Sequence, residues 1–232
     1  MMILEEKINL YKKNIEHLNA EISKICEKTG RKISDVLIIA ASKYADVDQI
    51  KEVKQLSIIN FGENRADELL EKYNSIGNDV IWHFIGHLQS RKVKIVVPLV
   101  DYIHSIDNTN TLEKINEEAL KINKVQKVLI EVNISGEESK YGINIEDVEN
   151  FLIHARKYSN VEIRGLMTMA PLTDDMEFIR VIFRKLKELK DRINSIFTGL
   201  SLTELSMGMS NDFKIAIEEG ATMIRVGSSI FT

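Results

Sequence analysis

Cysteine and proline are scarce in this chain of 232 residues, which contains one cysteine and two prolines. Because Cys26 has no second cysteine to pair with, an intramolecular disulfide is excluded, and a cysteine-based metal site is not expected. Two prolines and eleven glycines leave no linker rich in these residues, so no domain boundary is indicated. We therefore expect one domain over residues 1–232, a length that is common among β/α barrels.

Long apolar runs and a strong excess of charge are also missing. No stretch approaches 18 uncharged apolar residues, so no transmembrane helix is expected, and acidic residues interrupt any signal-peptide core near the start. The net charge of −4 gives no broad attraction to nucleic acid or to an anionic membrane. These absences predict a cytoplasmic protein that has neither nucleic acid nor membrane as a partner.

What the chain does contain is an alternation of short apolar runs and longer segments with helical spacing. Eight runs are rich in aliphatic residues and bounded by polar ones, as buried strands are: 36–42, 57–62, 81–86, 102–106, 127–134, 161–169, 202–207 and 223–227. Before the first run, one helix face is apolar and carries Ile8, Tyr11, Ile15, Leu18, Ile22 and Ile25. Gly30 fits the end of this helix.

Eight strand–helix repeats predict the α/β class and a single (β/α)₈ TIM barrel with an extra N-terminal helix. A doubly wound open sheet is the alternative, but no Gly-x-Gly-x-x-Gly follows the first run. A barrel shielded by helices leaves no large apolar segment, so a monomer is expected. In such a barrel the active face lies where strands end and helices begin.

Lys43 stands at the end of the first apolar run. A lysine at this position is expected at the rim of the core, where burial lowers its pKa. The neutral amine is the form that a carbonyl cofactor needs to make a Schiff base. The alternative is a lysine that merely extends its charge to solvent.

Two clusters of serine and glycine, 206–212 and 227–229, follow the last two runs. Barrels often bind phosphate with these loops, because glycine allows close approach and free N–H groups favour an anion. Helix capping by Ser210 or Asn211 is the alternative. Arg225 shares a strand face with Gly227 and should point into the barrel or its mouth. A buried arginine needs a partner, which would be an acid or a cofactor heteroatom.

The histidines invite a metal hypothesis that the spacing does not favour. His83 and His87 would face one ion on a helix, but residues 81–85 are typical of a strand, where positions four apart are separated by about 13 Å. We expect no metal site and expect both side chains to line or brace the mouth of the barrel. Glu63, Asp107 and Glu131 look scattered, which disfavours a barrel enzyme that uses a carboxylate pair.

Longer motifs stand at the strand ends: ASK (41–43), FGEN (61–64), WHFIGHLQ (82–89), VNISGEESK (132–140), RGLM (164–167), LSMGMS (205–210) and RVG (225–227). These motifs resemble those of the pyridoxal phosphate homeostasis proteins, a family similar to the N-terminal barrel of alanine racemase. They follow one another over nearly the whole chain. One departure is that the chain stops at Thr232 without the short tail usual in relatives, which leaves the rim near the last strand less certain.

The resemblance implies a barrel of PLP fold type III that binds pyridoxal 5′-phosphate (PLP) as a covalent aldimine on Lys43. It implies that Ser206, Ser210, Gly227 and Ser228 belong to the phosphate-binding segments. Arg225 matches the arginine that faces the pyridine nitrogen. The remaining pocket positions are matched by Asn64, His83 and Met207.

Two functions are compatible with this resemblance. One is a PLP carrier that supports vitamin B6 and amino-acid homeostasis and passes PLP to PLP-dependent apo-enzymes, without robust catalysis and with no catalytic residue. The other is a PLP-dependent amino-acid racemase, which needs acid/base groups on both faces of the α-carbon. In the alanine racemase family the opposing tyrosine comes from a separate β-domain, which is not expected here because the chain ends after the last strand. We therefore favour the carrier.

Overall fold

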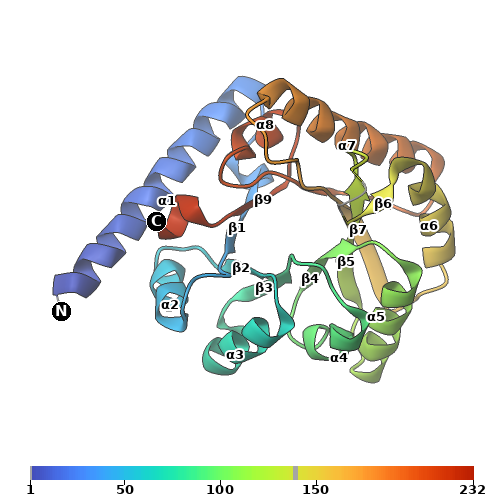
Figure 1. The fold of residues 1–232 in the computed structure, drawn as a ribbon, viewed down its shortest axis with the longest axis horizontal. Helices are drawn as coiled ribbons and strands as arrows, with labels where there is room; N and C mark the ends of the chain where they lie inside the picture. The colour runs from blue at the N-terminus through green and yellow to red at the C-terminus, as the bar shows by residue number, and fades with distance from the viewer. Residues whose placement is uncertain (1, 138–140) are drawn as a thin grey trace.

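The computed structural model describes residues 2–137 and 141–232, and eight parallel strands form a closed barrel at its centre (Figure 1). In order around the barrel the strands are β1 (Leu37–Ala41), β2 (Asn60–Glu63), β3 (Ile81–Phe84), β4 (Tyr102–Ile106), β5 (Gln126–Asn133), β7 (Val161–Met167), β8 (Glu204–Ser206) and β9 (Met223–Val226). Closure comes from pairing of β9 with β1 and of β4 with β5. A short strand, β6 (Ile143–Asn144), adds to the end of β5.

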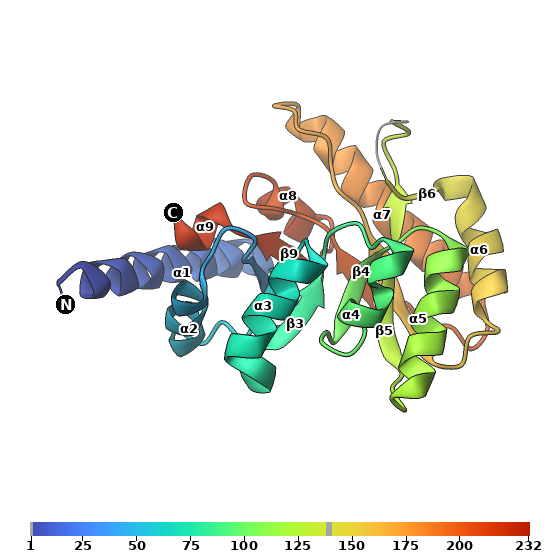
Figure 2. The ribbon, with the colours of Figure 1, turned by 60° about the horizontal axis from the view of Figure 1, so that its bottom comes forward.

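Helices lie around the outside of the barrel (Figures 1 and 2). The α-helices are α1 (Met2–Thr29), α2 (Val47–Gln55), α3 (Ala66–Ile76), α4 (Val93–Val96), α5 (Thr109–Lys121), α6 (Val148–Ala155), α7 (Met176–Ile196), α8 (Phe213–Glu218) and α9 (Ser228–Phe231). Short 3₁₀ turns are η1 (Ile33–Asp35), η2 (Gly77–Asp79), η3 (Ser90–Lys92) and η4 (Ile145–Asp147). No helix in the described part of the chain has the length and hydropathy needed to span a bilayer.

The predicted barrel and the extra N-terminal helix are both confirmed. Each of the eight predicted runs overlaps one barrel strand, whereas β6 was not predicted. Helix α1 buries Tyr11 and Leu18 from the predicted apolar stripe and packs beside α8 and α9 (Figure 1). Asn14 of α1 donates to the carbonyls of Ile230 and Thr232, so it anchors the C-terminal helix. The end of the 132–140 motif lies outside the described residues.

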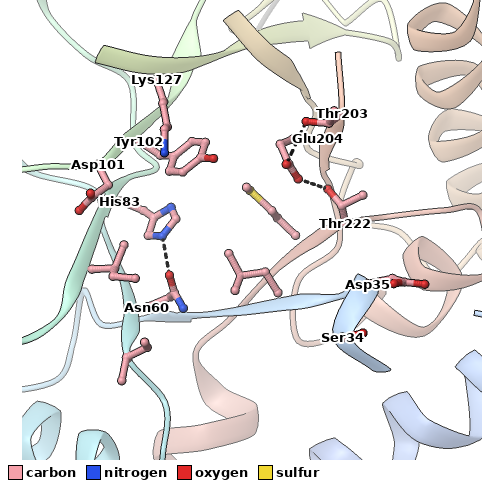
Figure 3. Close-up of a pocket in the computed structure, with 14 residues that line it drawn as sticks. Ser34, Asp35, Asn60, His83, Asp101, Tyr102, Lys127, Thr203, Glu204 and Thr222 are labelled. Carbon is pink, nitrogen blue, oxygen red and sulfur yellow. Dashed lines mark hydrogen bonds between the residues drawn. The ribbon is translucent and has the colours of Figure 1, made fainter. Parts of the chain in front are cut away.

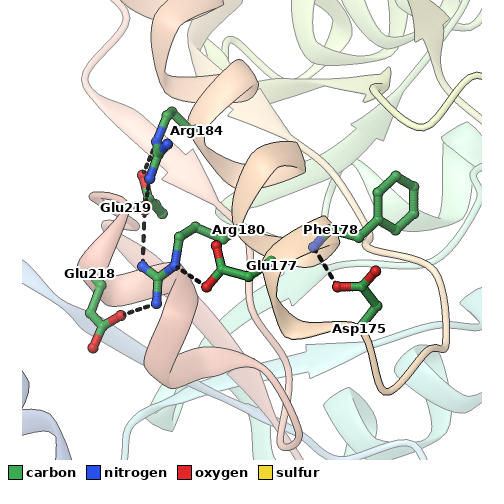
Figure 4. A network of polar contacts seen from close by, with 7 residues as sticks. All are labelled: Asp175, Glu177, Phe178, Arg180, Arg184, Glu218 and Glu219. Atoms are coloured by element: carbon green, nitrogen blue, oxygen red, sulfur yellow. Dashed lines mark hydrogen bonds and ion pairs between the residues drawn. The ribbon is translucent and has the colours of Figure 1, made fainter.

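Two arginines of α7 attach α8 to the barrel wall (Figure 4). Arg180 donates to Glu218 at 2.6 Å and to Glu219 at 3.0 Å, and Arg184 donates twice to Glu219, at 3.1 and 2.9 Å. Asp175 caps the start of α7 by accepting from the backbone N–H of Phe178. These ion pairs hold the C-terminal end of α8, the helix that follows the loop after β8.

The structure has two separate apolar regions, one outside the barrel strands and one inside them. Between the strands and the helices lies a large apolar core, which the alternate, outward-facing strand residues supply. Inside the barrel a small apolar cluster contains Leu37, Ile39, Leu129, Met167 and Met223. Polar side chains occupy much of the remaining barrel interior, and they form part of the site described next.

Candidate functional site

Lys43 lies in the turn between β1 and α2, two residues after the last residue of β1. Its side chain is exposed, and its Nζ lies 4.8 Å from the centre of the exposed Tyr44 ring. The prediction that Lys43 is buried at the rim is therefore wrong. The strand ends at Ala41, the buried Ser42 contacts Glu63 and Lys72 on the side of helix α3, and the next residue is exposed.

A buried ion pair lies beneath this turn. Glu63, at the end of β2, is fully buried, and Lys72 reaches it from α3 with Nζ 2.8 Å from Oε1. The Ser42 hydroxyl donates to Glu63 at 2.5 Å, and Lys72 donates to the Ser42 carbonyl at 2.7 Å. Burial raises the pKa of Glu63, while the bonds from Lys72 and Ser42 oppose this rise. The two charged side chains thus hold the residue before Lys43 at two atoms, its hydroxyl and its carbonyl oxygen.

The Lys43 turn and the end of β9 lie side by side. Ala40 pairs with Val226, and a Cβ at Gly227 would meet the Ala41 carbonyl oxygen at 3.0 Å. Only a residue without a side chain permits this approach without displacement. Hence the loops after the first and last barrel strands meet at one edge of the mouth.

Two backbone N–H groups converge next to that edge. Gly227 and Ser229 donate to the Ser210 hydroxyl oxygen at 3.2 and 3.4 Å. The preceding Gly208 has φ of +95°, and a Cβ there would meet Ala216 at 2.5 Å, so the β8 loop depends on glycine to turn toward β9. Ser228, between the two donors, is exposed. The structure brings the predicted Ser210, Gly227 and Ser228 together, and this donor set suits an anion.

Ser206 is placed differently from the prediction. Its side chain is fully buried inside the barrel, where Arg225 Nη1 donates to Oγ at 2.5 Å and His104 Nδ1 lies 2.9 Å away. Ser206 therefore belongs with Arg225, and its hydroxyl is not beside Ser210. Met207, the next residue, faces the opposite way and packs fully buried in the outer core. A ligand contact from Met207 would have to come from its backbone.

Arg225 is buried inside the barrel, as the strand alternation predicted, and only 4 % of it is exposed. Besides Ser206 it donates to the Thr168 carbonyl at 3.0 Å, so both hydrogen-bond partners are neutral oxygens. Burial lowers the pKa of Arg225 to about 10, and the carboxylates of Glu131 and Asp212 oppose this shift. The side chain stays a cation at neutral pH.

His83 does not lie at the mouth, so that part of the prediction is wrong. It is fully buried, its Nδ1 lies 3.0 Å from His104 Nε2, and its Nε2 lies 3.1 Å from Asn60 Oδ1. Asn60 is the first residue of β2, which places the contact toward the N-terminal end of the barrel (Figure 3). Sequence reasoning did not assign His104 to the site, although it lies in the strand Tyr102–Ile106.

Glu131 was also missed as part of the site. Burial raises its pKa to about 7, the charge of Asp107 raises it further, and Arg225 opposes the rise. Asp107 in turn lies 3.5 Å from His87 Nδ1, and the His87 ring stacks on Tyr141 at 4.0 Å between ring centres. Glu131 and Asp107 therefore influence each other, whereas Glu63, the third acid considered, is paired with Lys72. A lone acid inside the apolar run 127–134 was the available signal.

Asn64 follows β2 at the same end of the barrel as Lys43. Its Oδ1 is buried and has no hydrogen-bond partner, which makes it a ready acceptor for a ligand hydroxyl. A cavity of about 670 Å³ lies at the opposite, N-terminal end, where it is bordered by Asn60, Tyr102 and Glu204 among others (Figure 3). That cavity therefore lies away from Lys43 and the serine loops.

The chain is similar to known proteins along most of its length. The family described as "Alanine racemase, N-terminal domain" matches residues 14–232. A pyridoxal phosphate homeostasis protein from Aquifex aeolicus is 42% identical over 211 residues, which cover 90% of this chain and 92% of the relative. PipY from Synechococcus elongatus, whose structure was solved with PLP bound, is 31% identical with a TM-score of 0.82, covering 91% of this chain and 100% of PipY.

An alanine racemase from Clostridium difficile shares only the fold. It is 16% identical with a TM-score of 0.74, and the match covers 96% of this chain but 56% of the racemase. The sequence motifs, the closed barrel and the near full-length relatives agree with one another. The chain belongs to the family of pyridoxal phosphate homeostasis proteins, whose barrel is that of the alanine racemase N-terminal domain.

Proposed function

We propose that this protein binds PLP covalently through Lys43 and serves as a carrier of the cofactor. The observation that supports this most directly is that the exposed Lys43 turn meets the Gly227 loop, whose backbone N–H groups suit an anion. PipY, which is matched over its whole length, is described with PLP bound, and the curated relatives are named for PLP homeostasis.

The residues of the site suit the parts of PLP. The N–H groups of Gly227 and Ser229, with the hydroxyls of Ser210 and Ser228, would hold the phosphate. When bound, PLP supplies an aldehyde carbon that reacts with amines and a ring that withdraws electrons. Lys43 would provide the amine for covalent attachment.

The ring would be oriented by the remaining polar groups at the mouth. Arg225 would face the pyridine nitrogen, and since an arginine keeps its protons it would not donate one to that nitrogen. The unpartnered Oδ1 of Asn64 would accept from the ring hydroxyl. Ser206 would act at the ring end through Arg225, not at the phosphate.

A carrier role is favoured over racemisation by the relatives. The curated relatives of nearly the same length are named as homeostasis proteins, whereas the match covers little more than half of the alanine racemase. PLP-dependent apo-enzymes would be the recipients, and the protein would act as a single barrel over residues 1–232. A chiral assay with alanine separates the two functions, since robust interconversion of its enantiomers contradicts the carrier.

The covalent link is tested with purified protein and added PLP. Wild type should show a visible absorbance band, and borohydride should remove the band and add the mass of the reduced cofactor at Lys43. Lys43→Ala should lose the band, whereas Lys51→Ala, which removes an exposed lysine of α2, should keep it. A band that survives in Lys43→Ala, or a wild type that never develops one, contradicts the proposal.

A further inference from the structure

A continuous chain of buried hydrogen bonds crosses the inside of the barrel. It begins at Arg225 and passes through Ser206, His104 and His83 to Asn60, with contacts of 2.5, 2.9, 3.0 and 3.1 Å in that order. Each of these five residues comes from a different strand, namely β9, β8, β4, β3 and β2 in the same order. Each residue is at most 8 % exposed. The chain therefore connects the predicted ring end of the PLP site with the opposite face of the barrel.

The guanidinium gives this chain a direction. Arginine can only donate, so the Ser206 oxygen must accept from Arg225. Its own proton then has His104 Nδ1 as its acceptor, which places the His104 proton on Nε2. His104 Nε2–H donates to His83 Nδ1, and His83 donates from Nε2 to Asn60 Oδ1.

The opposite direction is disfavoured for two reasons. It would leave the buried hydroxyl proton of Ser206 without an acceptor, which is costly. It would also turn the positive ends of the imidazole dipoles toward the Arg225 cation. Both histidines are neutral, because burial lowers the pKa of His83 to about 3 and that of His104 well below its ordinary value.

The far end of the chain is held by stacking and reaches a cavity. Tyr102 lies parallel to the His83 ring, with 5.3 Å between centres and 8° between planes. Asn60 lies at the wall of the 670 Å³ cavity (Figure 3). Since its Oδ1 accepts from His83, its amide NH₂ is the group left to face that cavity.

We propose that Asn60, His83 and His104 are positioning residues, which fix the Ser206 hydroxyl and through it the guanidinium of Arg225. The proposal rests on the proposed function only in that Arg225 faces the PLP ring. None of the three residues would touch the cofactor. Their effect is transmitted by a fixed sequence of donors and acceptors.

The direction of the chain is tested without cofactor. Histidine labelled at its ring nitrogens is incorporated, and NMR identifies which nitrogen of each buried ring carries the proton. Both His83 and His104 are expected as neutral Nε2–H tautomers. A proton on Nδ1 of either ring, or a doubly protonated ring near neutral pH, overturns the proposal whether or not PLP binds.

The positioning role is tested at the residue farthest from the cofactor. Asn60→Leu removes the acceptor for His83, and we expect PLP affinity to fall about tenfold, the effect of one lost hydrogen bond, with an altered pH profile of the visible band. Asn60→Asp keeps the acceptor and should retain affinity within about twofold. Glu131 and Asp212, whose charges act on Arg225, are unchanged in both variants.

Controls separate this role from packing. Gln126→Leu alters another fully buried polar residue near the N-terminal end of the barrel, outside the chain, and should lower stability while leaving the band and affinity unchanged. If Asn60→Leu does not fold, Asn60→Ser serves as the second variant, because its shorter side chain also places no oxygen at the position of Asn60 Oδ1 beside His83. A folded Asn60→Leu or Asn60→Ser variant with wild-type affinity and band overturns the proposal. A wild type that binds no PLP refutes the proposed function instead, and the tautomer result still stands.

Discussion

The buried ion pair between Glu63 and Lys72 allows a test of what holds the turn that contains Lys43. Glu63 is fully buried, Lys72 is 8 % exposed, and their charged atoms lie 2.8 Å apart. Lys72 also donates to the Ser42 carbonyl at 2.7 Å. Lys72→Met therefore removes two charge-assisted hydrogen bonds and leaves the carboxylate with only the Ser42 hydroxyl.

The expected loss follows from this geometry. A hydrogen bond to a charged group contributes about 1.5–3 kcal/mol, and removal of one partner from a buried ion pair costs about 3–5 kcal/mol. We therefore expect Lys72→Met to lower the free energy of unfolding by about 3–5 kcal/mol at about pH 8.

The loss should depend on pH in a defined direction. Burial raises the pKa of Glu63 despite Lys72 and Ser42, and without Lys72 the pKa rises further. A carboxyl with a raised folded-state pKa destabilises the fold as pH rises from the unfolded value of 4.5 through the folded value. The deficit of Lys72→Met should thus shrink at about pH 5, where Glu63 takes up a proton.

Urea unfolding measures these differences through the fluorescence of Trp82, the one tryptophan of the chain, which is 1 % exposed. The double variant Glu63→Leu/Lys72→Met removes both charges and should lie within about 1 kcal/mol of wild type or above it. A single-variant loss below about 1 kcal/mol, or an equal loss at both pH values, would refute the reasoning. A double variant as unstable as the single would do the same.

Two further predictions concern carboxylates elsewhere in the barrel. The pKa of Glu131 is raised to about 7, mainly by burial. Wild type should therefore lose up to about 3 kcal/mol of its free energy of unfolding between about pH 5 and pH 8, whereas Glu131→Gln should not. Parallel pH profiles of urea unfolding for the two proteins would contradict this. Glu219→Gln weakens the contacts of Arg180 and Arg184 and should cost about 1 kcal/mol, less at about 1 M salt; a cost independent of salt would exclude an electrostatic origin.

The strands and the long first helix were predictable because their apolar patterns reflect burial directly. Each barrel strand is covered by helices on its outer side and packed on its inner side, so it reads as a short continuous apolar run. Strand β6 was missed because two residues, Ile143–Asn144, make no pattern. The meeting of the serine loops was predictable as well, since adjacent parallel strands end at the same edge.

The direction of individual side chains was harder to predict. The alternation of side chains along a strand predicts that Ser206 and Met207 face opposite ways. In a strand buried on both faces, it does not predict which of the two faces the barrel interior. The same limit misplaced His83 at the mouth. Lys43 was misjudged for another reason: the strand ends before it, and the turn at residues 43 and 44 sends its side chain outward.

The inside of the barrel has a composition that packing alone does not explain. An aliphatic interior would avoid the desolvation cost of Arg225, which is 4 % exposed and donates only to neutral oxygens. Two neutral histidines and an asparagine extend its partners instead of a carboxylate at contact distance. Such an arrangement keeps the cation poorly neutralised and rigid. An electron-rich ring nitrogen at the mouth would supply the further hydrogen-bond acceptor that Arg225 lacks inside the barrel. A ligand with such a nitrogen therefore explains the polar barrel interior better than a contribution to folding stability does.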